Sequence, residues 1–155
     1  MGVEIERKWL VDGGADSIPA EALTVEAVEI EQGYLTLGSD GGETRVRNKA
    51  GRYTLTVKSG RGLCRDEYEV PLTAEQFETL WPATAGARVH KLRRAVPGEG
   101  GVTIELDVYL GANDGLVVAE VEFDDPWGAE SFVAPYWFGR DVTAEDSYKN
   151  RNLAG

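Results

Sequence analysis

The stretch Val3-Glu4-Ile5-Glu6-Arg7-Lys8-Trp9 decides the fold, because its two glutamates and its lysine alternate with valine, isoleucine and tryptophan. In a β-strand, successive side chains point to opposite faces. One face of this strand would therefore be apolar and the other charged. The same alternation, with charges of both signs, returns in later strand-like segments. The pattern predicts a sheet that closes into a barrel around a charged interior.

Size and composition predict an ordinary water-soluble domain. The chain has 155 residues, of which 42% are hydrophobic and 28% charged, and we expect one domain over residues 1–155. No apolar run approaches the roughly 20 residues that a membrane span requires, and no secretory signal is visible. We therefore expect a cytoplasmic protein without a membrane partner. The single cysteine, Cys64, cannot form an internal disulfide, and we expect it to be a small buried filler.

Charge and ligand types narrow the classes of function. A formal net charge of −11 argues against nucleic-acid binding, which usually requires a basic surface. The single histidine, His90, and the absence of a cysteine cluster argue against zinc. Any metal should be a hard cation on oxygen ligands, with Mg²⁺ or Mn²⁺ as the candidates. The sequence leaves oligomeric state open, a homodimer included.

Glycine-rich turns such as Gly38-Ser39-Asp40-Gly41-Gly42 divide the chain into eight strand candidates. Most neighbouring candidates have hairpin spacing, which indicates antiparallel pairing. The expected strands span roughly residues 3–11, 29–37, 43–49, 53–59, 64–71, 88–96, 102–109 and 117–124.

Few helices are expected. A capping box at residues 73–76 opens one, which Pro82 should end. Asp125 followed by proline opens a second, running through Phe132. A third is expected to start at Thr143 and to run toward the C-terminus. The predicted class is therefore α+β, dominated by the sheet.

Alternate side chains of the expected strands gather paired carboxylates on some strands and paired cations on others. A solvated sheet face would also be polar, and the pattern alone leaves that alternative open. Such a face usually mixes in serine, asparagine and scattered charges. Inside a tunnel, arginine forks and lysines suit phosphate oxygens, and Glu-x-Glu pairs suit Mg²⁺ or Mn²⁺. The residues assigned to this face are Glu4, Glu6, Lys8, Gln32, Tyr34, Glu43, Arg45, Arg47, Thr54, Thr56, Lys58, Arg65, Glu67, Glu69, Lys91, Arg93, Glu105, Asp107, Glu120 and Glu122.

The segment Glu4-Ile5-Glu6-Arg7-Lys8 resembles the Glu-x-Glu-x-Lys signature of the CYTH, or triphosphate tunnel metalloenzyme, superfamily. The resemblance covers nearly the whole chain and implies an eight-stranded antiparallel β tunnel, a closed barrel with a few helices packed outside. The strand count obtained from the turns agrees with it. Further segments in the family's order are 32–35, 45–47, 56–59, 65–69, 91–93, 105–109, 120–123 and 148–150.

The resemblance also implies roles for individual residues. Lys8 and Tyr34 resemble a pair placed beside the attacking water. Glu67 and Glu69 are expected to orient neighbouring arginines, with metal binding as the alternative. Lys149 is expected either to close the tunnel mouth over the substrate or to be a plain surface lysine. The implied metal ligands are Glu4, Glu6, Glu120 and Glu122, with Asp107 in support. The implied substrate-binding residues are Arg45, Arg47, Lys58, Arg65, Lys91, Arg93 and Lys149.

The implied activity is divalent-metal-dependent hydrolysis of inorganic tripolyphosphate to pyrophosphate and phosphate. The compact length, Tyr34, and the segments 80–84 and 137–139 resemble the short bacterial triphosphatases. Three alternatives remain open: an adenylate cyclase, a thiamine or nucleoside triphosphatase, and a polyphosphate-binding module with little catalysis. A cyclase needs an adenine pocket, which the sequence does not reveal. A pure binder could dispense with the metal carboxylates.

The aromatic residues and the histidine are expected to be structural. The four tryptophans should be packing anchors between helices and the outside of the tunnel. His90 should face outward, away from any chemistry. The tryptophans are Trp9, Trp81, Trp127 and Trp137.

Overall fold

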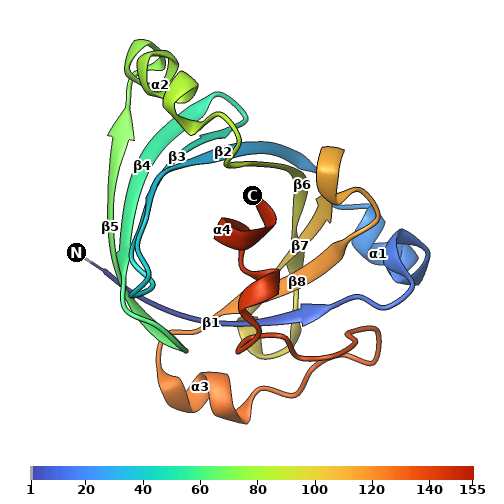
Figure 1. The fold of residues 1–155 in the computed structure, drawn as a ribbon. Helices are drawn as coiled ribbons and strands as arrows, with labels where there is room; N and C mark the ends of the chain where they lie inside the picture. Colours follow the sequence, from blue (N-terminus) through green and yellow to red (C-terminus); the bar gives the residue numbers. More distant parts are fainter. Residues whose placement is uncertain (1) are drawn as a thin grey trace.

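The computed structural model describes residues 2–155 and contains a closed antiparallel barrel of eight strands (Figure 1). The strand order around the barrel is β1-β5-β4-β3-β2-β6-β7-β8, and β1 pairs with both β5 and β8. Closure confirms the predicted tunnel and excludes an open sheet. The first and last residues of each expected strand lie within two residues of those observed. The strands are β1 Gly2–Leu10, β2 Val28–Leu37, β3 Glu43–Lys49, β4 Arg52–Ser59, β5 Cys64–Leu72, β6 Arg88–Pro97, β7 Thr103–Tyr109 and β8 Val117–Glu122.

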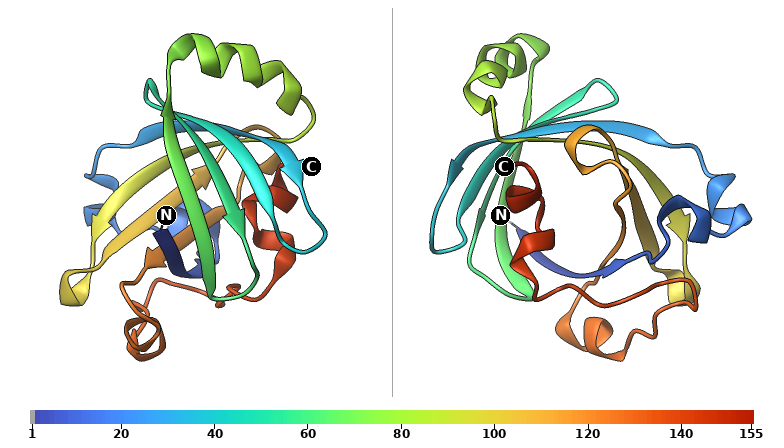
Figure 2. Two further views of the ribbon diagram at one scale, coloured as in Figure 1. Left: turned by 90° about the vertical axis from the view of Figure 1, so that its left-hand side faces the viewer. Right: turned by 45° about the vertical axis from the view of Figure 1, so that its right-hand side comes forward.

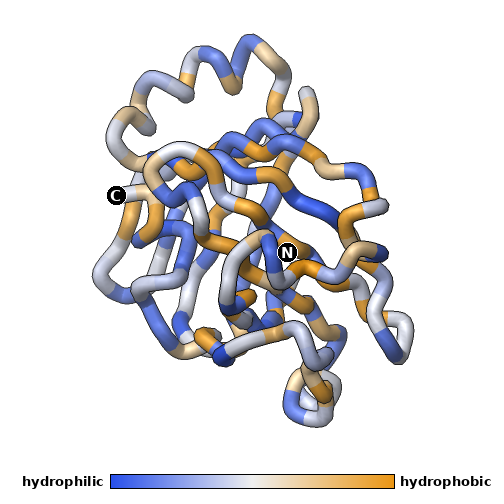
Figure 3. The backbone as a smooth tube through the Cα atoms, turned by 90° about the vertical axis from the view of Figure 1, so that its right-hand side faces the viewer, coloured by the Kyte–Doolittle hydropathy of each residue, from blue (hydrophilic) through white to orange (hydrophobic). Residues whose placement is uncertain are grey.

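The period of two separates charge from core as expected, and Figure 3 shows hydrophobic and hydrophilic residues alternating along the strands. Lys91 and Asp107 point into the lumen and are completely buried there. The outward apolar residues of β1, β7 and β8 form the main hydrophobic core with the segments that cover them. In this core the ring of Trp9 lies 5.5 Å from that of Phe132 and 5.0 Å from that of Phe138.

Three of the four α-helices lie outside the barrel (Figures 1 and 2). They are α1 Ala20–Leu23, which was not predicted, α2 Ala74–Leu80 and α3 Pro126–Ser131. The capping box of α2 is present, with Thr73 and Gln76 bonded reciprocally. The α-helix ends just before Pro82, as expected, with Trp81 as its C-cap, and a 3₁₀ turn follows over Trp81–Thr84.

The helix expected from Thr143 is wrong. Residues 141–143 instead run alongside β1, where the Val142 amide donates to the Lys8 carbonyl at 2.8 Å. The Thr143 hydroxyl, which could have capped a helix, accepts from the Lys8 amide at 3.0 Å and donates to Asp141. A 3₁₀ turn follows over Asp146–Tyr148, and the last helix, α4, spans only Asn150–Leu153.

Helix α4 lies within the ring of strands in the view of Figure 1. At this end the lumen-facing residues become apolar or aromatic, and Ala154 is buried among Tyr34, Tyr109 and Val118. Leu153 packs against the same cluster. The C-terminal segment therefore fills part of one end of the barrel with a small apolar plug.

Three structural expectations are corrected. Trp127 is not a packing anchor, since it is 75% exposed, and Cys64 is exposed rather than buried. The outward face of β4 and β5 is incompletely covered, because Val57, Tyr68 and Val70 remain exposed. The reason is that α2 contacts these strands at one end only, above them in Figure 2. Among residues 2–155, no helix combines the length and apolarity needed to cross a membrane.

Candidate active site

Cross-strand register pairs opposite charges inside the barrel. Lys8 of β1 stands opposite Glu120 of β8, and its Nζ lies 3.2 Å from Glu120 Oε1. Nearby, Lys58 Nζ lies 2.6 Å from Glu4 Oε2. All four residues are buried, so each charge partly offsets the cost of removing the other from water.

A second group of paired charges joins β6 to β7. Arg93 stands opposite Asp107 and binds it as a fork, with Nε to Oδ1 at 2.7 Å and Nη2 to Oδ2 at 2.8 Å. Lys91 Nζ lies 2.8 Å from Asp107 Oδ2, and Arg93 also pairs with Glu105 and, at 3.5 Å, with Glu120. This network fixes two of the predicted substrate cations at the lumen wall.

Two lumen arginines have no acidic partner. Within residues 2–155, no carboxylate forms an ion pair with Arg45 or Arg47. Arg47 binds only the neutral amide oxygen of Gln32, at 3.0 and 2.8 Å. The Nε atoms of Arg45 and Arg65 are buried without a hydrogen-bond partner in this part of the chain. A buried cationic donor without an acceptor costs free energy, so binding of an anion beside these arginines would be favourable.

The lowered pKa values of two lumen cations, Arg47 and Lys91, also indicate that negative charge is missing beside them. Burial, together with repulsion from Arg45 and Arg93, lowers the pKa of Arg47 to about 10. Burial and the neighbouring Arg93 lower the pKa of Lys91 to about 8, although Asp107 acts in the opposite direction. A bound polyanion would relieve both effects, because it supplies the missing negative charge.

Three carboxylates of the lumen have raised pKa values, because burial and neighbouring carboxylates outweigh the nearby cations. Burial, followed by repulsion from Glu120 and Glu4, raises the pKa of Glu6 to about 8. Burial and nearby carboxylates, Glu4 first among them, also raise the pKa of Glu122. Glu67 is in the same condition, because burial and Glu4 raise its pKa against the pull of Lys58. A cation among these side chains would relieve the repulsion.

The donor set fits a hard divalent cation, although the ligands are not already assembled. No three carboxylate, cysteine or histidine side chains of residues 2–155 lie close enough together to form a ready metal site. Glu4 is held by Lys58, and the buried Oε1 of Glu120 accepts no hydrogen bond from the described chain even though Lys8 is near. Oxygen ligands with spare lone pairs are those that Mg²⁺ and Mn²⁺ prefer. Glu6, Glu120 and Glu4 therefore fit the implied metal.

Lys8 and Tyr34 line the same chamber of the lumen. Lys8 Nζ donates to the Tyr148 carbonyl at 3.0 Å, and Tyr34 Oη accepts from Gln32 Nε2 at 3.0 Å. Burial opposes the charge on Lys8, but the carboxylates of Glu120 and Glu6 outweigh it and raise the pKa of Lys8. Burial raises the pKa of Tyr34. Both groups therefore hold their protons at neutral pH and act as hydrogen-bond donors.

The lumen has an inner chamber and an outer chamber. The inner chamber, at the α4 end, is about 50 Å³ and is lined by Lys8, Tyr34 and Lys149. The outer chamber is about 190 Å³ and is lined by Arg47 and Arg93 among others. Four residues of the predicted site, Glu4, Glu6, Arg45 and Lys58, line both chambers.

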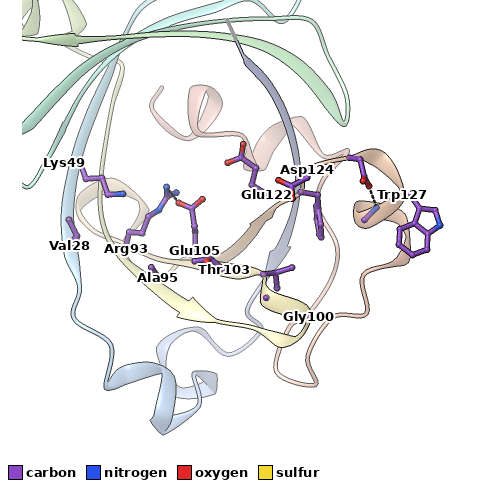
Figure 4. A pocket seen from close by; sticks show the side chains of 15 residues that line it. Val28, Lys49, Arg93, Ala95, Gly100, Thr103, Glu105, Glu122, Asp124 and Trp127 are labelled. Atoms are coloured by element: carbon purple, nitrogen blue, oxygen red, sulfur yellow. Dashed lines mark hydrogen bonds and ion pairs between the residues drawn. The ribbon is translucent and has the colours of Figure 1, made fainter.

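The outer chamber adjoins a hollow of about 640 Å³ at the barrel mouth, between the β3–β4 and β6–β7 turns. Figure 4 shows Arg93 and Glu105 directed toward one another in this hollow. Glu122, a predicted metal ligand, lies at this exposed mouth.

The structure thus gathers the predicted site residues around one lumen. Lys149 lines the inner chamber, but its Nζ pairs with Asp146 at 3.1 Å. Glu67 pairs with Lys58 at 3.7 Å and Glu69 accepts from Thr56 at 2.9 Å, while Glu67 also favours the charge on Arg45. The predicted site residues that line the two chambers or bind one another there are Glu4, Glu6, Lys8, Tyr34, Arg45, Arg47, Lys58, Arg65, Lys91, Arg93, Asp107, Glu120, Glu122 and Lys149.

Sequence reasoning assigned no role to two residues that complete the site. Asn150 lines both chambers, and its Oδ1 accepts from the Tyr109 hydroxyl and, at 3.4 Å, from Lys91 Nζ. Glu43 pairs with Arg65 at 3.3 Å. The alternation in β3 placed Glu43 inside, whereas nothing in the sequence around Asn150 shows that α4 enters the barrel.

Comparison with known proteins places this lumen in a family. Residues 2–145 match the CYTH domain. The chain belongs to the CYTH family. It is 44% identical to an inorganic triphosphatase of Nitrosomonas europaea over 97% of this chain and 96% of the relative. An inorganic triphosphatase of Acetivibrio thermocellus is 38% identical, over 99% of this chain and 94% of the relative.

Solved structures of CYTH-like barrels agree. The crystal structure of an inorganic triphosphatase has a TM-score of 0.71 and 42% identity, covering 99% of this chain and 95% of its own. A Pyrococcus horikoshii protein has a TM-score of 0.58 over 82% of this chain and 83% of its own. At 23% identity, the second comparison supports the fold alone.

The raised pKa of Glu6 predicts a pH-dependent gain in stability for Glu6→Gln. Because the folded-state pKa lies above the ordinary value of 4.5, the charge on Glu6 destabilises the fold fully above about pH 8 and hardly below pH 4.5. In EDTA, the variant should therefore raise Tm at pH 9 and leave it nearly unchanged at pH 5. Thermal melts at both pH values measure this, with Glu130→Gln on the exposed face of α3 as a matched control. An equal gain at both pH values would contradict the assignment.

Proposed function

We propose that this chain is a divalent-metal-dependent inorganic triphosphatase, a single-domain hydrolase that converts tripolyphosphate to pyrophosphate and phosphate. One observation carries the proposal. The lumen holds Arg47, whose pKa is lowered by burial and by neighbouring cations, together with Glu6, whose pKa is raised by burial and by neighbouring carboxylates. A metal complex of a compact polyanion supplies both missing charges at once. The names of the N. europaea and A. thermocellus relatives support the same choice.

Chemistry at the carboxylate side depends on a metal, for which we propose Mg²⁺ or Mn²⁺. Bound by Glu4, Glu6 and Glu120, with Asp107 and Glu122 in support, the metal would neutralise phosphate charge and activate water. Glu120 stays ionised because Lys8, Arg93 and Lys91 lower its pKa against the effect of burial.

The cationic side binds the substrate and stabilises the transition state. Phosphoryl transfer passes through a loose, in-line transition state, with charge on the equatorial oxygens. Guanidinium forks match these oxygens, and a preorganised lumen stabilises the developing charge without rearranging. The groups proposed for this role are Arg45, Arg47, Lys58, Arg65, Lys91, Arg93 and Lys149.

Lys8 and Tyr34 are proposed to orient the attacking water. Each holds its proton, so each donates to an oxygen and neither removes a proton in the resting state. Both line the inner chamber with Glu6, and the Gln32 amide links Tyr34 to Arg47, which supports a position between the carboxylates and the substrate cations.

A phosphate-release panel tests the proposal. Tripolyphosphate, ATP, thiamine triphosphate and pyrophosphate are each supplied with Mg²⁺ or Mn²⁺, and cyclic AMP is measured in the ATP reactions. Tripolyphosphate should be cleaved with the highest kcat/KM, and Glu6→Gln and Glu120→Gln should each abolish turnover while remaining folded. Full activity in both variants would remove the metal assignment, and preference for ATP with cyclic AMP formation would favour a cyclase.

Kinetics of Lys8→Ala and Tyr34→Phe test the water-orienting role. If these donors act on the attacking water, kcat should fall more than KM rises. Steady-state rates with tripolyphosphate measure the division, and Tyr53→Phe on the outer surface is the matched control. A loss confined to KM would make the two residues substrate-binding groups instead.

Ligand-dependent melting tests the unpaired arginines without any turnover. With EDTA present, tripolyphosphate at a hundredfold excess over Kd should stabilise the fold by about 2.7 kcal/mol, a shift of several degrees. The double variant Arg45→Ala, Arg47→Ala should lose most of that shift, since it lacks two guanidinium groups that would bind the anion. Chloride and sulfate at equal ionic strength are the controls. A sulfate effect equal to that of tripolyphosphate would indicate general screening.

A further inference from the structure

A second concentration of positive charge lies beyond the lumen, beside α4. Four cations, Arg61, Arg65, Lys149 and Arg151, line a cleft of about 190 Å³ in which the one carboxylate among the lining residues is Asp146. This excess is unusual in a chain with a net charge of −11. Local charge of one sign in a concave site concentrates ions of the opposite sign.

The cleft shares three of its lining residues with the active-site lumen. Arg65, Lys149 and Arg151 line both the cleft and the inner chamber. Arg65 is largely buried, and its Nε has no partner among residues 2–155. The same side chains can therefore contact an anion on either side of the wall that they form.

The arginines of the cleft are bound mainly to neutral groups. Arg61 donates to the Ser39 carbonyl, and Arg65 donates to the Gly41 carbonyl at 2.8 Å while pairing with Glu43 at 3.3 Å. Arg151 donates to the carbonyls of residues 38 and 42, at 2.7 and 3.3 Å. All these carbonyls belong to the loop between β2 and β3. Guanidinium groups bind phosphate oxygens more strongly than neutral carbonyls, so these contacts leave the cluster receptive to an anion.

The opposite mouth of the barrel has the reverse charge. Its hollow is lined by four carboxylates, Glu105, Glu122, Asp124 and Asp125, and by two cations. Of these cations, Arg93 already binds Asp107 and Glu105. A polyanion that approached the wide mouth would meet repulsion, whereas one that approached beside α4 would meet attraction.

We propose that the cluster Arg61, Arg65, Lys149 and Arg151 is an anion port: a second, external site that captures inorganic phosphate chains and passes them to the lumen through Arg65. That the captured anion is a substrate rests on the proposed triphosphatase function. The port itself requires only that phosphate chains reach the lumen from the α4 side. Arg61 is its outermost member, since it is exposed and does not line the inner chamber.

Substitution of Arg61 tests the port by kinetics. Arg61→Ala should lower kcat/KM for tripolyphosphate by roughly 3–10-fold at low salt, and Arg61→Glu by more, with the loss carried by KM and fading as KCl increases. Arg61→Lys should restore most of the rate, because it retains the charge. Arg52→Ala and Arg52→Glu make the same charge changes at the exposed β3–β4 end, next to the acidic mouth. Equal effects at Arg61 and Arg52 would overturn the proposal.

A binding measurement keeps the port testable if the chain proves not to hydrolyse tripolyphosphate. ³¹P line widths of tripolyphosphate with EDTA-treated protein give its dissociation rate, and calorimetry gives its Kd. The association rate obtained from the two should fall in Arg61→Glu and stay unchanged in Arg52→Glu. Failure of the phosphate-release panel with this difference intact would reject the proposed function and keep the port. An association rate insensitive to Arg61 would reject the port, whatever the panel shows.

Discussion

The two strand registers that set lysine and arginine opposite carboxylates are the constraint on which the lumen depends. Lys8 faces Glu120 across β1 and β8, and Arg93 faces Asp107 across β6 and β7. Removing such charges from water is expensive unless each finds a partner in good geometry. A slip of one residue in either pair would move a whole row of charges into the outer hydrophobic core. The register, and with it the closed barrel, is therefore fixed by both faces of the sheet.

In the described part of the chain, not every charged side chain inside this barrel has an ion-pair partner. The unpaired ones are the candidates for binding metal and substrate. Some paired groups are held in their charged forms, as Glu120 is by Lys8. The remainder, Arg47 on one wall and Glu6 on the other, carry pKa values displaced toward their neutral forms. A folded protein retains such destabilising groups at functional sites, where a ligand can supply the missing charge. The same displacement that weakens the empty fold therefore favours binding of a metal and a polyanion together.

The sequence predicted the barrel well because its two determinants are local. Alternation within each strand assigns faces, and glycine-rich turns set the boundaries, so residues such as Glu43 were correctly placed inside. The helix predicted from Thr143 was wrong because the Thr143 hydroxyl accepts a hydrogen bond from the backbone of β1. This partner lies 135 positions away in the sequence. The predicted burial of Trp127 and Cys64 was wrong because exposure depends on which segments cover a residue, and no local pattern encodes that. Asn150 was missed for the same reason, since its role exists only once α4 is inside the barrel.

The packing of α4 in one barrel end links stability to electrostatics. The apolar contacts of Leu153 and Ala154 with the aromatic cluster leave less space for water beside this cluster. Exclusion of water lowers the local dielectric, which strengthens every interaction between the remaining charges. Asn150 extends from this plug as a neutral amide, so it satisfies Tyr109 and Lys91 without altering the balance of charge. The plug therefore increases both the repulsion within each unpaired set and the free energy that a matching ligand would gain by relieving it.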